Sequence, residues 1–166
     1  LRFCATYDDA LEGADVVFEN VPEKLDLKHD VLRMADAATG PETPILSSAG
    51  GISPTQMQEV CSHPERLAVL HPFNPSHLIP LVEIVPGEET SPETTAWATE
   101  FSLLLGKKPI TLSREMPGHM VNRLQFALVR EAISCLMDGV ATAEDIDTAV
   151  RFGLAPRWLL QGGLQT

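Results

Sequence analysis

The sequence predicts an α/β fold: an incomplete, doubly wound parallel sheet followed by the start of an all-helical C-terminal domain. Two patterns predict it. Up to about residue 86, short apolar runs typical of buried strands alternate with segments whose apolar residues recur at helical spacing, as in a parallel sheet with crossover helices. After residue 120 the helical spacing alone continues. The change from one pattern to the other falls between residues 112 and 120.

The individual elements follow from these patterns and from their end signals. Ser53-Pro54 and Ser91-Pro92 each mark a helix start, because Ser accepts from free backbone N–H groups and Pro fits the first helical position. Thr142 opens a further helix in a sequence close to a capping box. The expected strands are residues 15–19, 44–47, 67–70, 81–85 and 108–112. The expected helices are residues 8–13, 24–38, 53–60, 91–105, 120–139 and 142–152.

Composition and charge exclude several classes of partner. The 166 residues hold 12 Lys and Arg against 23 Asp and Glu, for a net charge of −11. Such a surface repels phosphate backbones, so we expect no nucleic-acid partner. No apolar run approaches the length that crosses a bilayer, and no charged-then-apolar leader opens the chain. We therefore expect a soluble, cytoplasmic protein with no membrane partner.

The three cysteines agree with a reducing compartment. Cys4, Cys61 and Cys135 are far apart and have no CxxC motif or His-rich neighbourhood. An odd number of isolated cysteines argues against a disulfide framework, and we expect no metal site. Cys135 lies in a helical apolar pattern and is expected to pack in a core.

One signal of a nucleotide-binding fold is missing. Doubly wound folds of this kind normally begin with a strand, a Gly-rich turn and a helix whose N-terminus receives the pyrophosphate. No GxGxxG occurs in this sequence, and the chain starts in the middle of the pattern. We expect it to be a fragment that ends within the helical part, in a segment that resembles a linker.

The most informative segment for chemistry is Leu70-His71-Pro72-Phe73-Asn74-Pro75, followed by Leu81-Val82-Glu83. His71 leaves the end of an apolar strand, and ligands bind at such ends in open α/β sheets. An imidazole there can take a proton from a substrate hydroxyl as hydride leaves the same carbon. A carboxylate at its other nitrogen, which Glu83 can supply, would fix the tautomer and stabilise the imidazolium.

The same residues also fit a structural interpretation. His71 can be a strand-end histidine bonded to the backbone, and Glu83 a solvated charge. Chemistry alone leaves both interpretations open, because such histidines are common.

Three motifs in one order resemble the 3-hydroxyacyl-CoA dehydrogenase superfamily. They are His71-Pro-Phe-Asn-Pro, Leu81-Val-Glu83 and Pro117-Gly-His-Met-Val-Asn122-Arg123. Residues 14–19 with Pro22-Glu23 resemble the family's fourth strand and its NAD-contacting turn, and residues 144–153 resemble its helical domain. The resemblance spans nearly the whole chain. It implies that residues 1–115 are the C-terminal part of a Rossmann NAD-binding domain and that 116–166 begin a helical substrate and dimerisation domain.

The resemblance also implies roles for single residues. His71 corresponds to the family's catalytic base, Glu83 to its carboxylate partner and Asn122 to an Asn that hydrogen-bonds the substrate, although Asn122 can equally cap locally. Glu19, Lys28 and Ser47 are expected to line the cofactor, NAD. For Lys28, a solvated helix face is an equal alternative.

The sequence departs from the family pattern at two places. Gly50 stands where relatives carry a substrate-binding Ser, so either Ser48 or backbone N–H groups of the glycine turn would bind the substrate oxygen instead. His119 stands where relatives commonly have an aromatic residue, and we expect it to pack or to lie between domains rather than to act as a second base.

Arg157-Trp158 bears on the substrate. An Arg followed by an aromatic resembles the branch of the superfamily that acts on free hydroxy acids, such as L-gulonate 3-dehydrogenase with its relative lambda-crystallin, and L-carnitine dehydrogenase. A guanidinium can grip a carboxylate and an indole can stack against a cation, but a surface Arg near a helix end fits equally well. Relatives are commonly dimers, so we expect a homodimer.

These observations together predict NAD-dependent oxidation of an L-3-hydroxy acid, or of a 3-hydroxyacyl-CoA, to the 3-keto product. The alternatives are a non-catalytic or structural relative that lost the Ser at position 50, and a fragment with no activity alone.

Overall fold

The structure is a computed structural model, and it describes residues 2–165. The chain divides into two compact units, Leu1–Met120 and Val121–Thr166. The first unit is an α/β layer structure and the second is helical, so the predicted fold class is confirmed. The assignment of functional domains on either side of residue 115 stays a prediction.

The first unit is built on a five-stranded sheet in the order β1-β2-β3-β4-β5. The strands β1, β2 and β3 are parallel to one another, β4 is antiparallel to β3, and β5 is parallel to β4. The strands are β1 (Val17–Glu19), β2 (Ile45–Ser47), β3 (Leu67–Pro72), β4 (Leu81–Pro86) and β5 (Lys108–Thr111).

The parallel sheet that was expected has one exception, because β4 runs antiparallel to β3. The connection between β3 and β4, residues 73–80, contains no helix. A connection without a crossover helix is too short to return to the start of a parallel neighbour, so it joins antiparallel strands. This reversal places residue 83 of β4 directly opposite residue 71 of β3.

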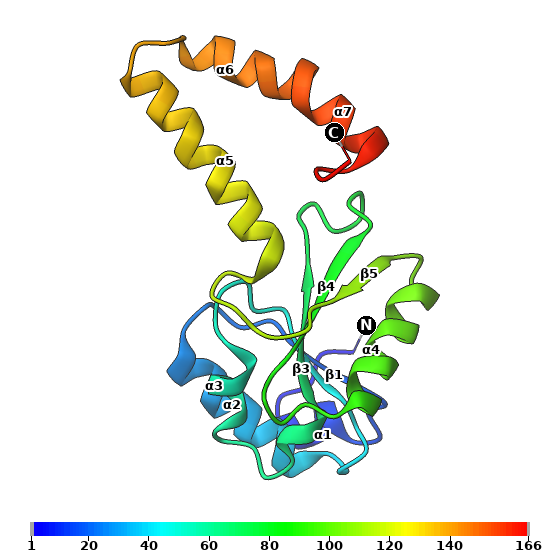
Figure 1. Cartoon of the computed structure of the whole chain (residues 1–166). Helices are drawn as coiled ribbons and strands as arrows, with labels where there is room; N and C mark the ends of the chain where they lie inside the picture. The colour runs from blue at the N-terminus through cyan, green and yellow to red at the C-terminus, as the bar shows by residue number, and fades with distance from the viewer. Residues whose placement is uncertain (1, 166) are drawn as a thin grey trace. The chain divides into compact units, whose positions relative to one another are not determined.

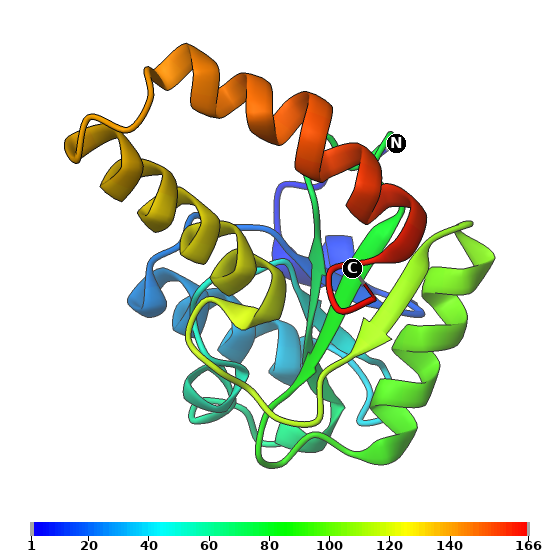
Figure 2. The same ribbon diagram turned by 45° about the horizontal axis from the view of Figure 1, so that its top comes forward.

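Helices cover both faces of the sheet. Figures 1 and 2 show α2 and α3 on one side and α4 on the other. One core packs Leu32 of α2 and Met57 of α3 against β2 and β3, and the other packs Ala98 of α4 against β3 and β4. The helices of this unit are α1 (Tyr7–Leu11), α2 (Leu25–Ala38), α3 (Pro54–Gln58), the 3-10 helix η1 (Pro64–Arg66) and α4 (Pro92–Leu104). Ser53 and Ser91 cap α3 and α4 as expected.

A buried ion pair ties the end of α2 to η1. Nη2 of Arg66 lies 2.7 Å from Oδ1 of Asp36, and both side chains are almost fully buried. Nη1 of Arg66 also donates to the carbonyls of Gly40 and Thr43 in the loop after α2. The pair therefore fixes the chain that enters β2.

We expect Arg66→Ala to lower the free energy of unfolding by about 3–5 kcal/mol, because it leaves a buried carboxylate without its cation. Urea unfolding followed by circular dichroism measures the change. Arg33→Ala is the matched control, since Arg33 pairs with Asp30 on the exposed face of the same helix, and it should cost less than about 1 kcal/mol. Equal losses in the two variants would contradict the prediction.

The second unit continues α5 (His119–Met137), which begins in the first. It then holds α6 (Ala143–Ala149), a short π-helix η2 (Val150–Leu154) and α7 (Ala155–Gln161). The Thr142–Asp145 capping box is complete. Residues 155–161, for which no helix was expected, form α7, and Pro156 falls in its first turn, where its missing N–H is not needed. Among residues 2–165, none of the helices has the length and apolar composition that crossing a bilayer requires.

The cysteines at positions 4, 61 and 135 are all free thiols and half-buried. Burial raises the pKa of the Cys61 thiol to about 11, and the nearby carboxylate of Asp36 acts in the same direction. Since the thiolate is the reactive form, a raised pKa lowers the reactive fraction at any pH below it.

At pH 8 we expect Cys61 to react with iodoacetamide at least about tenfold more slowly in the folded chain than in urea, where an ordinary thiol pKa near 8.5 returns. Peptide mass spectrometry after timed quenching measures the rate at this cysteine. The difference should shrink as the pH rises toward the raised pKa. Equal rates in both states at pH 8 would contradict the raised pKa.

Candidate active site

His71 and Glu83 meet at the carboxyl end of β3. They are opposite partners in the antiparallel ladder, so their side chains project from the same face of the sheet. Nδ1 of His71 lies 3.1 Å from Oε2 of Glu83. The Glu83 side chain is fully buried, whereas 12% of the His71 side chain is exposed. The interpretation of Glu83 as a solvated charge is therefore wrong.

The contact fixes which nitrogen of His71 carries the proton. An ionised carboxylate only accepts hydrogen bonds, so Nδ1 carries the hydrogen and donates it to Glu83. Nε2 then keeps its lone pair and can act as a base. The ring of Phe73 packs edge-on against the His71 ring at 4.7 Å between centroids, and the ring of His119 lies at 5.3 Å. The imidazole is held between its hydrogen-bond partner Glu83 and two rings.

A second cluster lies at the carboxyl ends of β1 and β2. The Glu19 carboxylate accepts from Nζ of Lys28 at 2.8 and 3.0 Å and from Oγ of Ser47 at 2.5 Å. The N–H of Val21 also donates to it, at 2.6 Å. All three predicted cofactor residues are buried, so the alternative of a solvated Lys28 is wrong. The structure thus brings Glu19, Lys28 and Ser47 together at the carboxyl ends of β1 and β2.

The turn after β2 is fastened by Glu23, a residue for which this contact was not expected. The backbone N–H groups of Gly51 and Ile52 both donate to Oε1 of Glu23, each at 2.9 Å. These two N–H groups therefore already have a hydrogen-bond partner, and neither is left to bind a substrate oxygen in place of the Ser expected at position 50. Ser48, the other substitute considered for Gly50, is half-buried, and its N–H donates to the Glu19 carbonyl. No local signal marks Glu23 for this role, because its partners lie far along the chain.

Asn122 and Arg157 belong to the second unit. Asn122 lies in the first turn of α5 and is half-buried, and Arg157 is exposed on α7. Trp158, the neighbour of Arg157, is 38% exposed. Their contacts with a substrate stay predictions.

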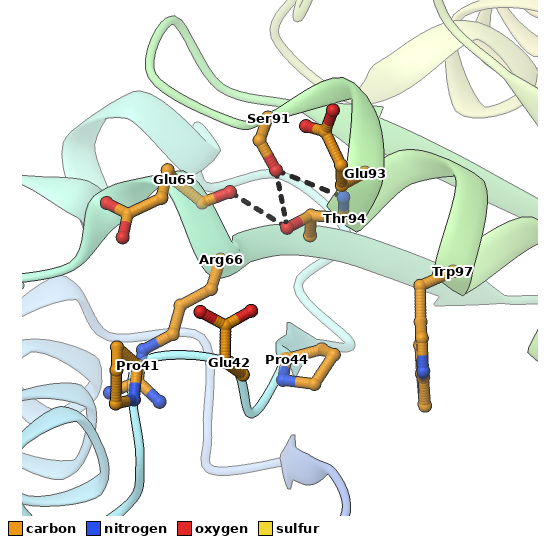
Figure 3. Close-up of a pocket in the computed structure, with 9 residues that line it drawn as sticks. All are labelled: Pro41, Glu42, Pro44, Glu65, Arg66, Ser91, Glu93, Thr94 and Trp97. Carbon is orange, nitrogen blue, oxygen red and sulfur yellow. Dashed lines mark hydrogen bonds between the residues drawn. The ribbon is translucent and has the colours of Figure 1, made fainter.

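A cavity of about 350 Å³ lies at the other end of the sheet. It opens beside the amino ends of β2 and β3, between Pro44, Arg66 and the start of α4 (Figure 3). Two of its lining residues are joined by a hydrogen bond, in which Oγ1 of Thr94 donates to the Glu65 carbonyl. Its lining residues include none of the residues predicted for the site, so we separate this cavity from the candidate active site.

Comparison with known proteins matches both parts of the chain to one family. Residues 1–116 match the model of the 3-hydroxyacyl-CoA dehydrogenase NAD binding domain, and residues 118–160 match that of the 3-hydroxyacyl-CoA dehydrogenase C-terminal domain. The chain belongs to the 3-hydroxyacyl-CoA dehydrogenase family. The resemblance carried by the three sequence motifs is thereby confirmed.

Curated relatives of this family member include L-carnitine dehydrogenases. That of Streptomyces coelicolor is 47% identical over 161 residues, which are 97% of this chain and 51% of the relative. That of Pseudomonas putida is 45% identical over 166 residues, which are 100% of this chain and 52% of the relative. The chain spans about half the length of these relatives.

Solved structures of the family share the fold. A 5-formyl-3-hydroxy-2-methylpyridine 4-carboxylic acid 5-dehydrogenase, described as an NAD+ dependent dismutase, superposes with a TM-score of 0.94 at 38% identity and covers 99% of this chain and 53% of its own. The 3-hydroxybutyryl-CoA dehydrogenase from Escherichia coli has a TM-score of 0.86 at 34% identity, with 92% of this chain and 32% of its own covered.

Proposed function

We propose that this chain carries the general base and part of the cofactor site of an NAD-dependent dehydrogenase that oxidises the C3 hydroxyl of an L-3-hydroxy acid or its thioester. The observation that carries the proposal is the contact of 3.1 Å between Nδ1 of His71 and the buried Glu83 carboxylate. It leaves a basic Nε2 at the end of a strand where ligands bind in such sheets. The competing idea of a non-catalytic relative is disfavoured by this intact pair.

The reaction assigns one task to each residue. Nε2 of His71 accepts the proton of the C3 hydroxyl, and the hydrogen on C3 leaves with its electron pair, so that the C–O bond becomes a carbonyl. Hydride acceptance is the chemistry that a bound nicotinamide supplies. Glu83 offsets the positive charge that His71 gains. His71 then releases the proton to solvent, and a 3-keto product leaves.

The cluster around Glu19 fits the nicotinamide half of NAD. Its single buried cation, Lys28, is neutralised by Glu19, so the cluster offers no unpaired charge to a phosphate and suits an uncharged amide and ribose hydroxyls. The carboxylate of Glu23 is about half exposed beside it, which suits the positive ring of the oxidised cofactor. Glu19, Lys28 and Ser47 would therefore form the floor of this part of the cofactor site.

For the substrate, we favour a free 3-hydroxy acid with a cationic group over a CoA thioester. The curated relatives named above are L-carnitine dehydrogenases. Arg157 and Trp158 on α7 offer the guanidinium and the indole that a carboxylate and a quaternary ammonium require. The net charge of −11 also disfavours the several phosphates of CoA.

The test is an NADH-forming assay of the full-length protein with three substrates: L-carnitine, L-3-hydroxybutyrate and L-3-hydroxybutyryl-CoA. We expect the highest kcat/KM with L-carnitine. Faster oxidation of the CoA thioester would overturn the substrate class and leave the base in place. If none of the three substrates yields NADH, the result would count against dehydrogenase activity. If the Gly50→Ser variant then restores turnover, the protein is a relative that lost its activity when the Ser at position 50 was lost.

We also propose that the protein acts as a cytoplasmic homodimer. Apolar side chains on α5 are exposed, among them Leu124 at 64% and Ile133 at 51%. Light scattering of the full-length protein measures its mass in solution, and a monomer at micromolar concentration would contradict the dimer.

A further inference from the structure

His119 contacts two parts of the candidate site at once. Its side chain is 1% exposed, and its Nε2 lies 2.9 Å from the Ala49 carbonyl in the turn after β2. Its ring lies beside that of His71. The next residue, Met120, donates its backbone N–H to Oε1 of Glu83 at 3.1 Å. Two successive residues, His119 and Met120, thus connect the turn after β2 to the His71–Glu83 pair.

The backbone at His119 is held in a sparsely populated conformation. Its φ is +54°, in the left-handed region, directly after Gly118 at +74°. A side-chain-bearing residue is strained in this region and persists there only when its surroundings determine it. The left-handed bend aims the His119 side chain at the turn and the following N–H at Glu83. Both contacts depend on this one bend.

A single hydrogen bond sets the orientation of the ring. Because a carbonyl only accepts, Nε2 of His119 carries the hydrogen and Nδ1 does not. Nδ1 is buried and has no hydrogen-bond partner among the described residues. A phenyl ring at this position would fill similar space without an unpaired buried acceptor. The bond to Ala49 is therefore the distinguishing contribution of a histidine at this position.

We propose that His119 is a positioning residue that sets the spacing between the turn at residues 49–51 and the His71–Glu83 pair. This inference rests on the proposed function, in which that pair takes the proton of a substrate hydroxyl. His119 contacts both parts, because its Nε2 bonds to the Ala49 carbonyl of the turn and its ring lies beside that of His71. Loss of the bond to Ala49 would free the His119 ring to shift, and with it the position of the His71 ring that it contacts.

The test compares three variants of the full-length protein. His119→Phe keeps a ring but removes the bond to Ala49, and His119→Gln keeps an N–H that can donate to it. His29→Phe is the matched control, because Nε2 of His29 contacts the Gln56 carbonyl at 2.7 Å, between α2 and α3. We expect His119→Phe to lower kcat/KM for the hydroxy substrate by about tenfold or more, since a small displacement of reacting groups is costly.

Two further readouts distinguish positioning from stability. His119→Gln should recover kcat/KM to within about threefold of the wild type, and His29→Phe should leave it unchanged. Hydrogen exchange at the amides of residues 50–52 should accelerate in His119→Phe under conditions where urea unfolding shows the chain to be folded. A loss of kcat/KM that Gln does not rescue, with unchanged exchange in the turn, would overturn the inference.

The outcomes also separate this inference from the proposed function. If His71→Gln abolishes turnover while His119→Phe leaves kcat/KM within twofold and the turn's exchange unchanged, the positioning role fails and the base assignment stands. If His71→Gln remains active, the proposed function fails. The exchange measurement then still decides whether His119 fastens the turn.

Discussion

Replacing His71 by Gln is expected to lower kcat of the full-length protein by about a hundredfold or more. The amide side chain fills similar space and can still contact Glu83, but it has no basic nitrogen to accept the hydroxyl proton. Because NAD and the substrate carboxylate would bind elsewhere, the KM values should change little. Steady-state assays of NADH formation with saturating NAD measure both quantities.

His63→Gln is the matched control for this substitution. His63 is about half exposed and pairs with Glu65 beside η1, at the other end of the sheet. The His63→Gln variant also loses an imidazole, but this imidazole lies outside the candidate site. Its turnover should therefore equal that of the wild type. A His71→Gln protein with turnover within about twofold of the wild type would remove the central assignment.

Replacing Glu83 by Gln is expected to lower kcat by about ten-thousandfold, by analogy with the loss of the carboxylate in a catalytic triad. The Gln amide can donate to Nδ1 of His71, which moves the proton to Nε2 and removes the basic lone pair. The charge that offsets the imidazolium is lost as well. The wild-type carboxylate also accepts from the Met120 N–H, and the Gln carbonyl can keep that contact.

Nitrogen-15 shifts of the His71 ring give a readout that does not depend on activity. We expect hydrogen on Nδ1 in the wild type and on Nε2 in Glu83→Gln. Glu88→Gln, an exposed carboxylate between β4 and α4, is the control and should change neither turnover nor tautomer. An unchanged tautomer together with full turnover in Glu83→Gln would show that the carboxylate does not orient the base.

Periodicity and end signals predicted most elements of the fold. Ser53 and Ser91 cap their helices as expected, and all five expected strands form. Three features were not predicted, because they depend on more than the local sequence. The direction of β4 depends on what its connection can span, the helix through Gln161 depends on where Pro156 falls within a turn, and the burial of Lys28 depends on Glu19 lying across from it.

The candidate site shows the same division. The motif around His71 and the motif around Glu83 marked the two residues, and the short connection between β3 and β4 allows them to meet as partners in the antiparallel ladder. No sequence pattern predicted the contacts of Glu23 with the turn or of His119 with Ala49. A carboxylate or an imidazole has no local pattern that states which distant backbone group it will contact.

Residue types and their spacing along the chain were enough to predict the family, the layered α/β class and His71 and Glu83 as candidates for a base and its partner. The antiparallel direction of β4, which makes Glu83 face His71, became visible only once the chain was folded, as did the contacts of Glu23 and His119 with the turn. The physical reason is that hydrogen bonds and ion pairs form between groups that folding brings within about 3 Å, whatever their separation in sequence.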